Sequence, residues 1–255
     1  KAALRGALAW VAPALLLPLP WWWRNVRVYG LGDPLGLERH DAIVTGQPRT
    51  ADWIAQFGLT AYLERLGEFT FKSFWGVFGW LGVFLDGRVY ALLGLVSLLV
   101  AVGLLARSGG WPRLADWQRR GLGLLGFQAV LVAAGYAWYN LTFVQHQGRY
   151  LFPALLPLAI AFALGWQGLH TPRGSLAGAV LAAVAGAGLL WTGWRGGDVD
   201  GRAVLVTAVV AAALAGQSRR RLPPAVWDAI VPVLLVFLAV YALFGAIVPQ
   251  LGSGG

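Results

Sequence analysis

The sequence predicts an all-α polytopic transmembrane helical bundle with about seven spans. Apolar stretches near 20 residues recur along the chain, and a helix needs roughly 20 apolar residues to cross about 30 Å of hydrocarbon. The composition is 58% hydrophobic and 12% charged, and soluble domains carry about twice that charged fraction. The stretches are continuously apolar rather than alternating, which favours helices over strands.

The predicted spans belong to one membrane domain covering residues 1–255, in which the last six spans form a bundle over 89–248. The seven spans are Ala7–Trp23, Val89–Ala106, Gly121–Asn140, Tyr150–Leu169, Gly174–Trp194, Ala203–Gly216 and Val226–Val248. The sixth is the shortest, so a tilted, shallow or re-entrant segment is an alternative there. Because the chain opens on Lys1 without a methionine, we expect the N-terminal part of a longer protein to be missing.

The distribution of lysine and arginine predicts the orientation. The loops on the side of the N-terminus hold ten basic and two acidic residues, whereas the other loops hold ten basic and nine acidic residues. Since cytoplasmic loops carry the basic excess, we expect the N-terminus to be cytoplasmic in a bacterial inner (plasma) membrane. The loop 24–88 and the C-terminus are then extracytoplasmic.

Within the long extracytoplasmic loop 24–88, the sequence pattern predicts two segments that lie at the membrane surface. Apolar residues recur at helical spacing over 51–67, which indicates an amphipathic interfacial helix. The stretch Phe69–Leu85 is rich in aromatic residues but is interrupted by Lys72. Tryptophan and phenylalanine favour the headgroup zone, so we interpret this stretch as interfacial rather than as an eighth span.

Composition also excludes several kinds of chemistry. The chain has no cysteine, which excludes disulfides and thiol catalysis. No cluster of histidine, aspartate and glutamate has the spacing of metal ligands, so no metal site is predicted, no cofactor is identified, and a divalent-metal requirement stays open. The net charge of +9 is dispersed among short loops, which favours membrane lipids over nucleic acid as partners.

Residues 145–153 lie where one long apolar run ends and the next begins, and they carry the strongest candidate site. Arg149 is permanently charged and can bind phosphate in a bidentate manner, and His146 and Tyr150 lie beside it in sequence. Polar groups at the mouth of a span are costly unless they are solvated or paired, so such groups often mark a ligand site. The alternative is that Arg149 extends to lipid headgroups while Tyr150 belongs to an aromatic belt.

A second group of polar residues follows three consecutive tryptophans, Trp21–Trp23. Arg24, Asn25 and Asp33 would line an outward-facing cavity, together with Gln147. The alternative is an interfacial anchor followed by a turn, because Asp33 is followed by proline among several glycines.

Aromatic residues and one histidine in the long loop complete the candidates. Trp75 and Trp80 lie among glycines that permit close approach, so both are predicted to line the same cavity and to stack on a sugar ring; interfacial anchoring explains them equally well. The neighbouring His40 and Asp41 could act as acid and base. Adjacent residues on an extended strand point to opposite faces, so a solvated loop pair is the favoured interpretation.

Three motifs, in this order and spacing, resemble a known family. They are Arg24-Asn25 with the glycine-rich turn 29–36, then the aromatic stretch Ser73–Trp80, then Gln147–Pro153. Over roughly residues 10–170 the chain resembles the C-terminal half of a bacterial multispanning family called domain of unknown function 2142. That family is similar to the GT-C membrane glycosyltransferases.

The resemblance implies an enzyme that moves a sugar from a polyprenyl-phosphate donor to an acceptor on the outer face. It implies a donor-phosphate role for Arg149, with His146 and Tyr150 beside it. The acidic residue essential to such enzymes lies near their N-terminus, so no catalytic base is assigned here. A noncatalytic membrane subunit or scaffold that packs against a protein partner is the first alternative. A lipid-linked sugar carrier is the second, although the spans hold few mid-membrane polar residues.

Overall fold

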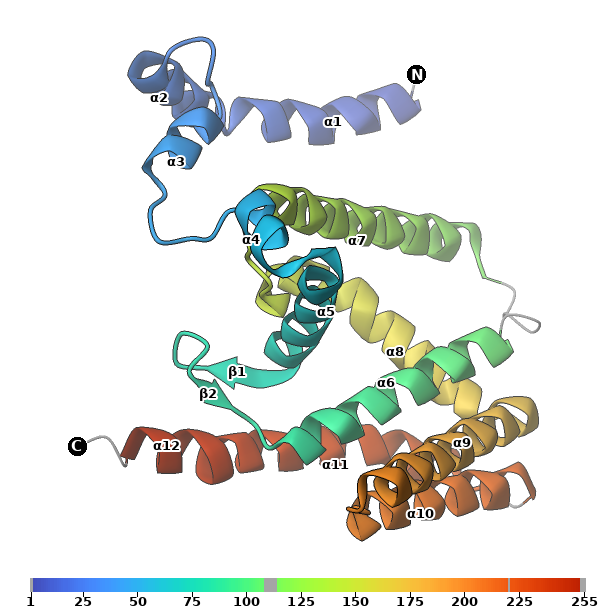
Figure 1. Ribbon diagram of the computed structural model, residues 1–255. Helices are drawn as coiled ribbons and strands as arrows, with labels where there is room; N and C mark the ends of the chain where they lie inside the picture. Colours follow the sequence, from blue (N-terminus) through green and yellow to red (C-terminus); the bar gives the residue numbers. More distant parts are fainter. Residues whose placement is uncertain (1, 108–113, 220, 253–255) are drawn as a thin grey trace. The chain divides into compact units, whose positions relative to one another are not determined.

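The computed structural model describes residues 2–107, 114–219 and 221–252, and its elements are almost entirely helical. Figure 1 shows the helices and the small two-stranded sheet. The chain falls into two compact units, Lys1–Arg49 and Thr50–Gly255, which are described separately below. The interpretation as a single membrane domain stays a prediction.

The first unit contains α1 (Ala2–Leu16), α2 (Leu19–Tyr29) and α3 (Leu37–Ile43). The sequence predicts one span over Ala7–Trp23, but the structure divides it between α1 and α2. Prolines explain the division, because Pro18 precedes α2 and Pro20 occupies its first turn, where the missing N–H costs nothing. With 15 and 11 residues, neither helix alone reaches the roughly 20 residues that a span needs. The predicted first span is therefore interrupted between Leu16 and Leu19, and its crossing of the membrane stays a prediction.

The second unit contains six helical segments that are long and apolar enough to cross a membrane, and they match the last six predicted spans. The first four are α6 (Gly87–Arg107), α7 (Asp116–Thr142), η1 (Gly148–Ala154) continuing into α8 (Leu155–Leu169), and α9 (Pro172–Gly196). The last two are α10 (Gly201–Arg219), and α11 (Pro224–Tyr241) continuing through η2 (Ala242–Ile247) into α12 (Val248–Gly252). At 19 residues, α10 is longer than the predicted span Ala203–Gly216 and long enough to cross.

Polar contacts show which connections of the second unit lie at the same end. Arg88, which begins α6, pairs with Asp200 before α10 (Nε–Oδ2 3.3 Å), and Gln250 near the C-terminus donates to the Phe84 carbonyl (3.2 Å). At the opposite end, Arg107 donates to Gln167 (3.2 Å). Successive spans therefore alternate in direction, as Figure 1 also shows.

The segment that precedes α6 forms two helices and a hairpin. A single helix is predicted over 51–67, but α4 (Thr50–Phe57) and α5 (Leu59–Gly76) are separated at Gly58, whose φ of +89° favours glycine. The stretch Phe69–Leu85 comprises the end of α5 and a hairpin of β1 (Val77–Phe78) and β2 (Val83–Phe84), and its place at the membrane surface stays a prediction. Trp80, in the hairpin turn, is 93% exposed.

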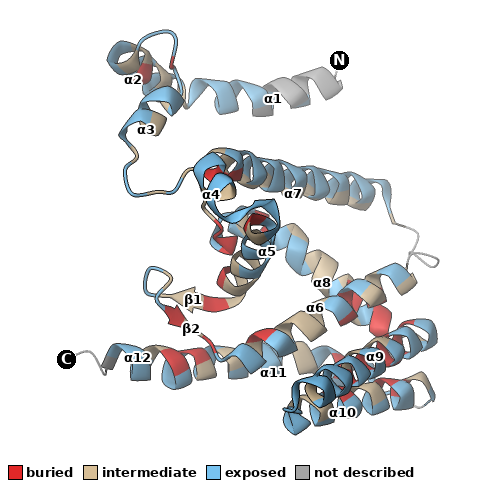
Figure 2. Ribbon diagram, viewed as in Figure 1, coloured by how far each residue is buried: buried red, intermediate tan, exposed pale blue. Residues whose placement is uncertain are grey.

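Two clusters of buried side chains hold the second unit together, as the red segments of Figure 2 indicate. One joins α6, α8, α9, α10 and α11 through Leu99, Leu169, Ala179, Leu214 and Trp227. The other packs Leu85 and Tyr90 against Ala242 and Ala246 of η2. Large apolar side chains cover much of the outside of the spans, as expected of helices that face lipid.

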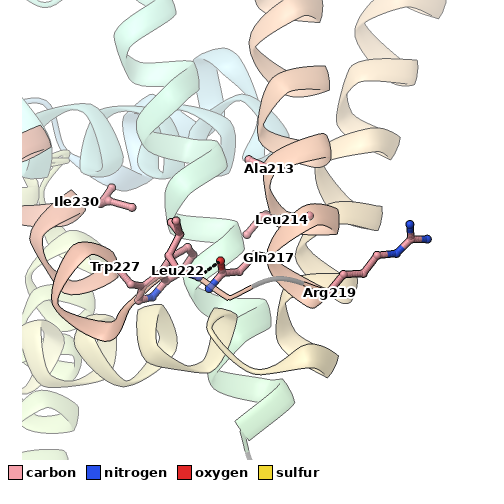
Figure 3. A pocket seen from close by; sticks show the side chains of 8 residues that line it. Ala213, Leu214, Gln217, Arg219, Leu222, Trp227 and Ile230 are labelled. Atoms are coloured by element: carbon pink, nitrogen blue, oxygen red, sulfur yellow. Dashed lines mark hydrogen bonds between the residues drawn. The ribbon is translucent and has the colours of Figure 1, made fainter.

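The turn between α10 and α11 borders a cavity of about 500 Å³, shown from close by in Figure 3. Its wall includes Gln217, which contacts His170 through Nδ1 (2.7 Å) and accepts a hydrogen bond from the Leu222 N–H (2.9 Å). The Trp227 ring stacks on that of Trp166, with centroids 4.5 Å apart. The cavity is therefore built on a firmly bonded end of the bundle.

Candidate functional site

The connection between α7 and η1 lies against α4 and α5, and Asn140 organises it. The Asn140 carbonyl accepts hydrogen bonds from the Thr50 hydroxyl (2.8 Å) and the Tyr62 hydroxyl (2.6 Å). Its side-chain oxygen accepts the Gln145 N–H (3.0 Å). Asn140 is 2% exposed, so these bonds satisfy groups that would be costly to bury alone. The start of α4 and the first turn of α5 are thereby fixed to the end of α7.

The next residues bring two of the sequence motifs together. The Gly148 N–H donates to the Ser73 hydroxyl of α5 (2.7 Å), and the rings of Phe74 and Phe152 meet edge to face at 5.7 Å. A Cβ on Gly148 would lie 2.1 Å from the Thr70 carbonyl oxygen. Only glycine permits this approach, so the Gly148–Arg149 backbone is held directly on α5.

His146 is buried in this connection, at 4% exposure, beside the Tyr62 ring (centroids 4.9 Å apart). Neither of its ring nitrogens has a hydrogen-bond partner among the described residues, and the same holds for Gln147 Oε1. Burial, and secondarily the charge of Arg65, lower the pKa of His146 to about 4. The imidazole is therefore neutral at pH 7 and keeps one nitrogen as an acceptor.

Arg149 and Tyr150 follow at the surface. Both are exposed, and the Arg149 guanidinium lies 5.7 Å from the centre of the Tyr150 ring. The Gln147 side chain instead turns inward, and its amide donates to Gln145 Oε1 (2.7 Å). The accessible, permanently charged Arg149 thus follows two buried residues with free acceptor atoms, His146 and Gln147, in the sequence. The guanidinium can bind a phosphate, and the acceptor atoms can bind a hydroxyl group.

The two tryptophans assigned to the cavity lie in different surroundings. Trp75 is half-buried on α5, in edge contacts with Phe74 (5.7 Å) and Phe71 (6.5 Å). Trp80 occupies the hairpin turn with a φ of 55°, and its side chain is exposed. Trp75 therefore belongs to the aromatic surface around η1, whereas Trp80 suits contact with a membrane surface or a mobile ligand.

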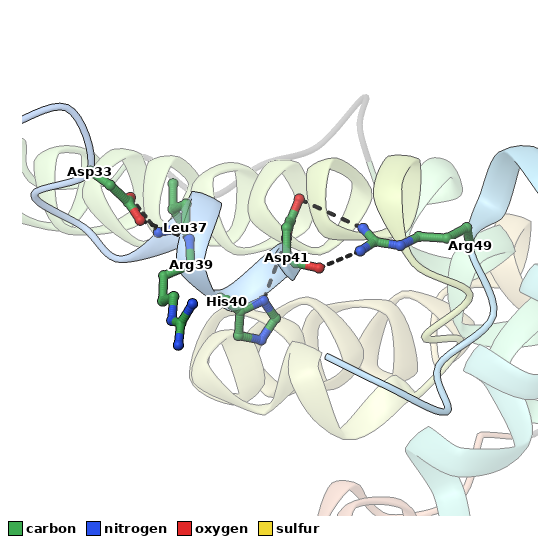
Figure 4. Close-up of polar contacts among 6 residues, drawn as sticks. All are labelled: Asp33, Leu37, Arg39, His40, Asp41 and Arg49. Atoms are coloured by element: carbon green, nitrogen blue, oxygen red, sulfur yellow. Dashed lines mark hydrogen bonds and ion pairs between the residues drawn. The ribbon is translucent and has the colours of Figure 1, made fainter. Parts of the chain in front are cut away.

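Arg24, Asn25 and Asp33 lie in the first unit, where they form local contacts. Arg24 donates to Asn25 Oδ1 (3.1 Å), and Asn25 is 1% exposed. The Asp33 carboxylate accepts the backbone N–H groups of Leu37 (2.6 Å) and Arg39 (2.9 Å), as Figure 4 shows. The Arg39 N–H contributes most to lowering the pKa of Asp33.

Asp33 also lines a cavity of about 640 Å³ within the first unit, with Tyr29, Glu38 and Arg39 on its wall. Since both carboxylate oxygens already accept backbone N–H groups, Asp33 holds the start of α3 in place. A cavity shared between these residues and Arg149, which belong to different units, stays a prediction.

His40 and Asp41 are adjacent on α3 rather than on an extended strand. Their side chains approach to 3.5 Å (Nδ1–Oδ1), and Arg49 pairs with the same carboxylate (NH1–Oδ2 3.7 Å), as Figure 4 shows. All three side chains are between 37% and 46% exposed. This partly solvated ion-pair group fits a role in fixing the end of the first unit better than acid–base catalysis.

The sequence did not predict that Thr50, Tyr62, Ser73 and Asn140 position the site. Their partners are 75 to 90 residues away in sequence, so no local spacing reveals them. One signal is present: Tyr136 and Asn140 place two polar side chains one turn apart near the C-terminal end of the apolar helix α7. In the described part of the chain, no group of three or more histidine, aspartate or glutamate side chains is placed to hold a metal ion.

Compared with known proteins, the chain matches no family model, no curated protein and no solved structure. The membrane-spanning helical class rests on its own helices. The resemblance to the GT-C-like family stays a prediction.

Proposed function

We propose that this chain is a GT-C-like membrane glycosyltransferase, or the C-terminal half of one, that binds a polyprenyl-phosphate sugar on the outer face. The single observation that supports this proposal most is the α5–η1 junction. There Ser73 and Gly148 join two motifs that are 75 residues apart. The junction presents Arg149 at the surface beside buried His146 and Gln147, which have unpaired polar atoms.

The chemistry of the donor explains why both kinds of group are useful. A polyprenyl phosphate needs a cationic partner at the headgroup layer, and a guanidinium supplies two parallel hydrogen bonds to its oxygens. Charge develops on this phosphate as the glycosidic bond breaks, so the same contact would stabilise the transition state. Neutral His146 and the Gln147 amide oxygen supply acceptors for sugar hydroxyls. The aromatic surface formed by Phe74, Trp75 and Phe152 suits the sugar ring or the first isoprene units.

The proposed orientation follows from charge. The end of the bundle that carries this junction also carries Arg88 paired with Asp200, whereas most arginines of the sequence after residue 88 fall in the loops of the other end. With the arginine-rich end in the cytoplasm, the junction and the C-terminus face the outside, where polyprenyl-linked donors of GT-C-like enzymes are used.

Replacing Arg149 with alanine tests the proposal directly. The purified chain in lipid nanodiscs would be titrated with polyprenyl phosphate and with the uncharged polyprenol. We expect Arg149→Ala to weaken phosphate binding by about 30-fold, the loss of one charge-assisted bidentate contact of about 2 kcal/mol, with polyprenol binding unchanged. Arg149→Lys should keep part of the affinity, because lysine keeps the positive charge but cannot form the bidentate hydrogen bonds of a guanidinium.

Arg195→Ala is the matched control, since this exposed arginine ends α9 at the same end of the bundle. Equal loss in both variants would assign the effect to general surface charge and would contradict a site at Arg149. Sugar transfer, measured with the same variants, should fall in the same order. Unchanged transfer in Arg149→Ala would remove the assignment.

One observation favours the alternative of a noncatalytic subunit. The apolar window of α7 contains no buried residue, and Gly123 and Gly126, three residues apart on one helix face, have open space where a side chain would be. Small residues on such a face permit close packing with another membrane helix. Cysteine crosslinking from Gly123→Cys in native membranes checks this: a discrete crosslinked protein of another size supports the subunit, and a ladder without discrete bands contradicts it.

A further inference from the structure

The arginine-rich end of the bundle has a feature that the proposed glycosyl transfer does not use. The cavity at the α10–α11 turn lies between the last two turns of α10 and the first two turns of α11. Its walls are mainly carbon, from Ala213, Leu214, Leu222 and Ile230. The volume of about 500 Å³ is within the roughly 300–1,000 Å³ of small-molecule sites.

The polar groups of this cavity are already satisfied by the protein. Gln217 is 4% exposed, contacts His170 Nδ1 and accepts the Leu222 N–H. The Trp227 indole N–H donates to the Trp166 carbonyl (3.1 Å), and the Trp166 indole N–H donates to the Trp227 carbonyl (3.1 Å). An occupant therefore meets an apolar lining and needs no polar group inside the cavity.

Charge lies at the rim instead. Among the described residues that line the cavity, Arg219 is the only charged one; its side chain extends away from Trp227 in Figure 3. Arg221 follows in the same turn, and Arg173 begins α9 at this end. The only acidic residue between positions 217 and 230 is Asp228. An apolar cavity with a basic rim at the end of a transmembrane bundle complements a molecule with a hydrocarbon chain and an anionic head.

We propose that this cavity binds an anionic phospholipid of the cytoplasmic leaflet. One acyl chain occupies the space between α10 and α11, and the phosphate meets Arg219 and Arg221. Basic pockets between transmembrane helices on the cytoplasmic side bind anionic headgroups, and an arginine stem can line the apolar part while its guanidinium reaches the headgroup. The site is independent of the junction at Arg149, which lies at the opposite end of the spans.

Native mass spectrometry of the chain, loaded with phosphatidylglycerol or phosphatidylcholine in mild detergent, tests the proposal. We expect the chain to retain phosphatidylglycerol in preference to phosphatidylcholine. The double variant Arg219→Gln/Arg221→Gln should weaken phosphatidylglycerol binding by about 30-fold, at about 1 kcal/mol for each basic residue near the surface. The charge-matched control is Arg195→Gln/Arg202→Gln, which removes two arginines at the other end of α9 and α10 and should leave the preference intact.

A filling variant tests the cavity itself. A Cβ at Gly216 would meet no atom within 4 Å, so Gly216→Leu should fold and occupy the space, lowering retention of both lipids. Equal retention of the two lipids by the unmodified chain would overturn the proposal. The same follows if the two double variants behave alike, because the effect would then be diffuse charge. Unchanged retention in Gly216→Leu would also overturn it, since the acyl chain would lie elsewhere.

Discussion

Replacing Gly103 with leucine is expected to destroy the packing of α6 on α8. A Cβ at this position would lie 2.1 Å from the Gly165 carbonyl oxygen and 2.9 Å from Leu169 Cγ. The first contact is with backbone, which cannot rotate away as a flexible side chain does. The two helices must therefore separate, and the buried cluster around Leu99 and Leu169, at 5% and 0% exposure, would open.

Overpacking a core by a few methylenes costs about 1–3 kcal/mol, occasionally more. The clash at Gly103 is against a neighbouring helix backbone, so we expect a loss of at least about 3 kcal/mol. Thermal unfolding of the purified chain in detergent, followed by circular dichroism, measures the change. A markedly lower midpoint, or failure to elute as a single species, is the expected result.

Gly94→Ala is the matched control on the same helix. Its new Cβ would meet only Phe71 Cζ at 3.8 Å, an ordinary contact. Alanine in place of a helical glycine stabilises by about 0.5–1 kcal/mol, so this variant should unfold at the same temperature or higher. If both variants unfolded alike, the close approach of α6 and α8 would be contradicted.

The spans show which part of the fold can be predicted from sequence. Six of the seven predicted spans coincide with apolar helices, because continuous hydrophobicity over about 20 residues is a local property. The first predicted span is divided into two helices because Pro18 and Pro20 constrain the backbone, an effect that the count of apolar residues does not register. Gly58 divides the predicted surface helix for a related reason: its left-handed φ is invisible to the periodicity of its neighbours.

The candidate site could be predicted only in part. The run of polar residues around Arg149 is visible in sequence because it interrupts two apolar runs. The residues that surround this run cannot be read from the sequence, since Asn140 gains its partners Thr50 and Tyr62 only when the chain folds. Burial of His146 follows from that folding. Sequence thus located the polar connection, and the structure added which of its side chains are buried and which are open.

Acid should destabilise the chain through His146. Its pKa is about 4 in the folded chain against an ordinary 6.5, so the unfolded chain binds the proton more readily. Stability is then complete above about pH 6.5, falls as the pH drops towards 4, and levels off below that. The shift corresponds to a loss of about 3 kcal/mol. Urea unfolding in detergent between pH 7.5 and 4 measures it.

Other acid-sensitive groups act outside this window. The pKa values of Asp33 and Asp200 are lowered from 3.8, mainly by backbone N–H groups of Arg39 and Ala203. Their contribution to stability is present above pH 4 and is lost only below it. A loss between pH 6.5 and 4 is therefore not expected from these two carboxylates.

The variant His146→Phe distinguishes the effect of this histidine on stability from its effect on ligand binding. Phenylalanine has no titratable group, so the loss between pH 6.5 and 4 should disappear. It also removes two buried nitrogens without partners, so stability at pH 7 should be unchanged or higher.

If the imidazole serves as an acceptor for a donor hydroxyl, the same variant should bind a polyprenyl-phosphate sugar more weakly while binding polyprenyl phosphate normally. An acid profile identical to that of the unmodified chain would show that another group titrates. A variant that is more stable and binds the sugar donor with full affinity would contradict a role of His146 in ligand binding.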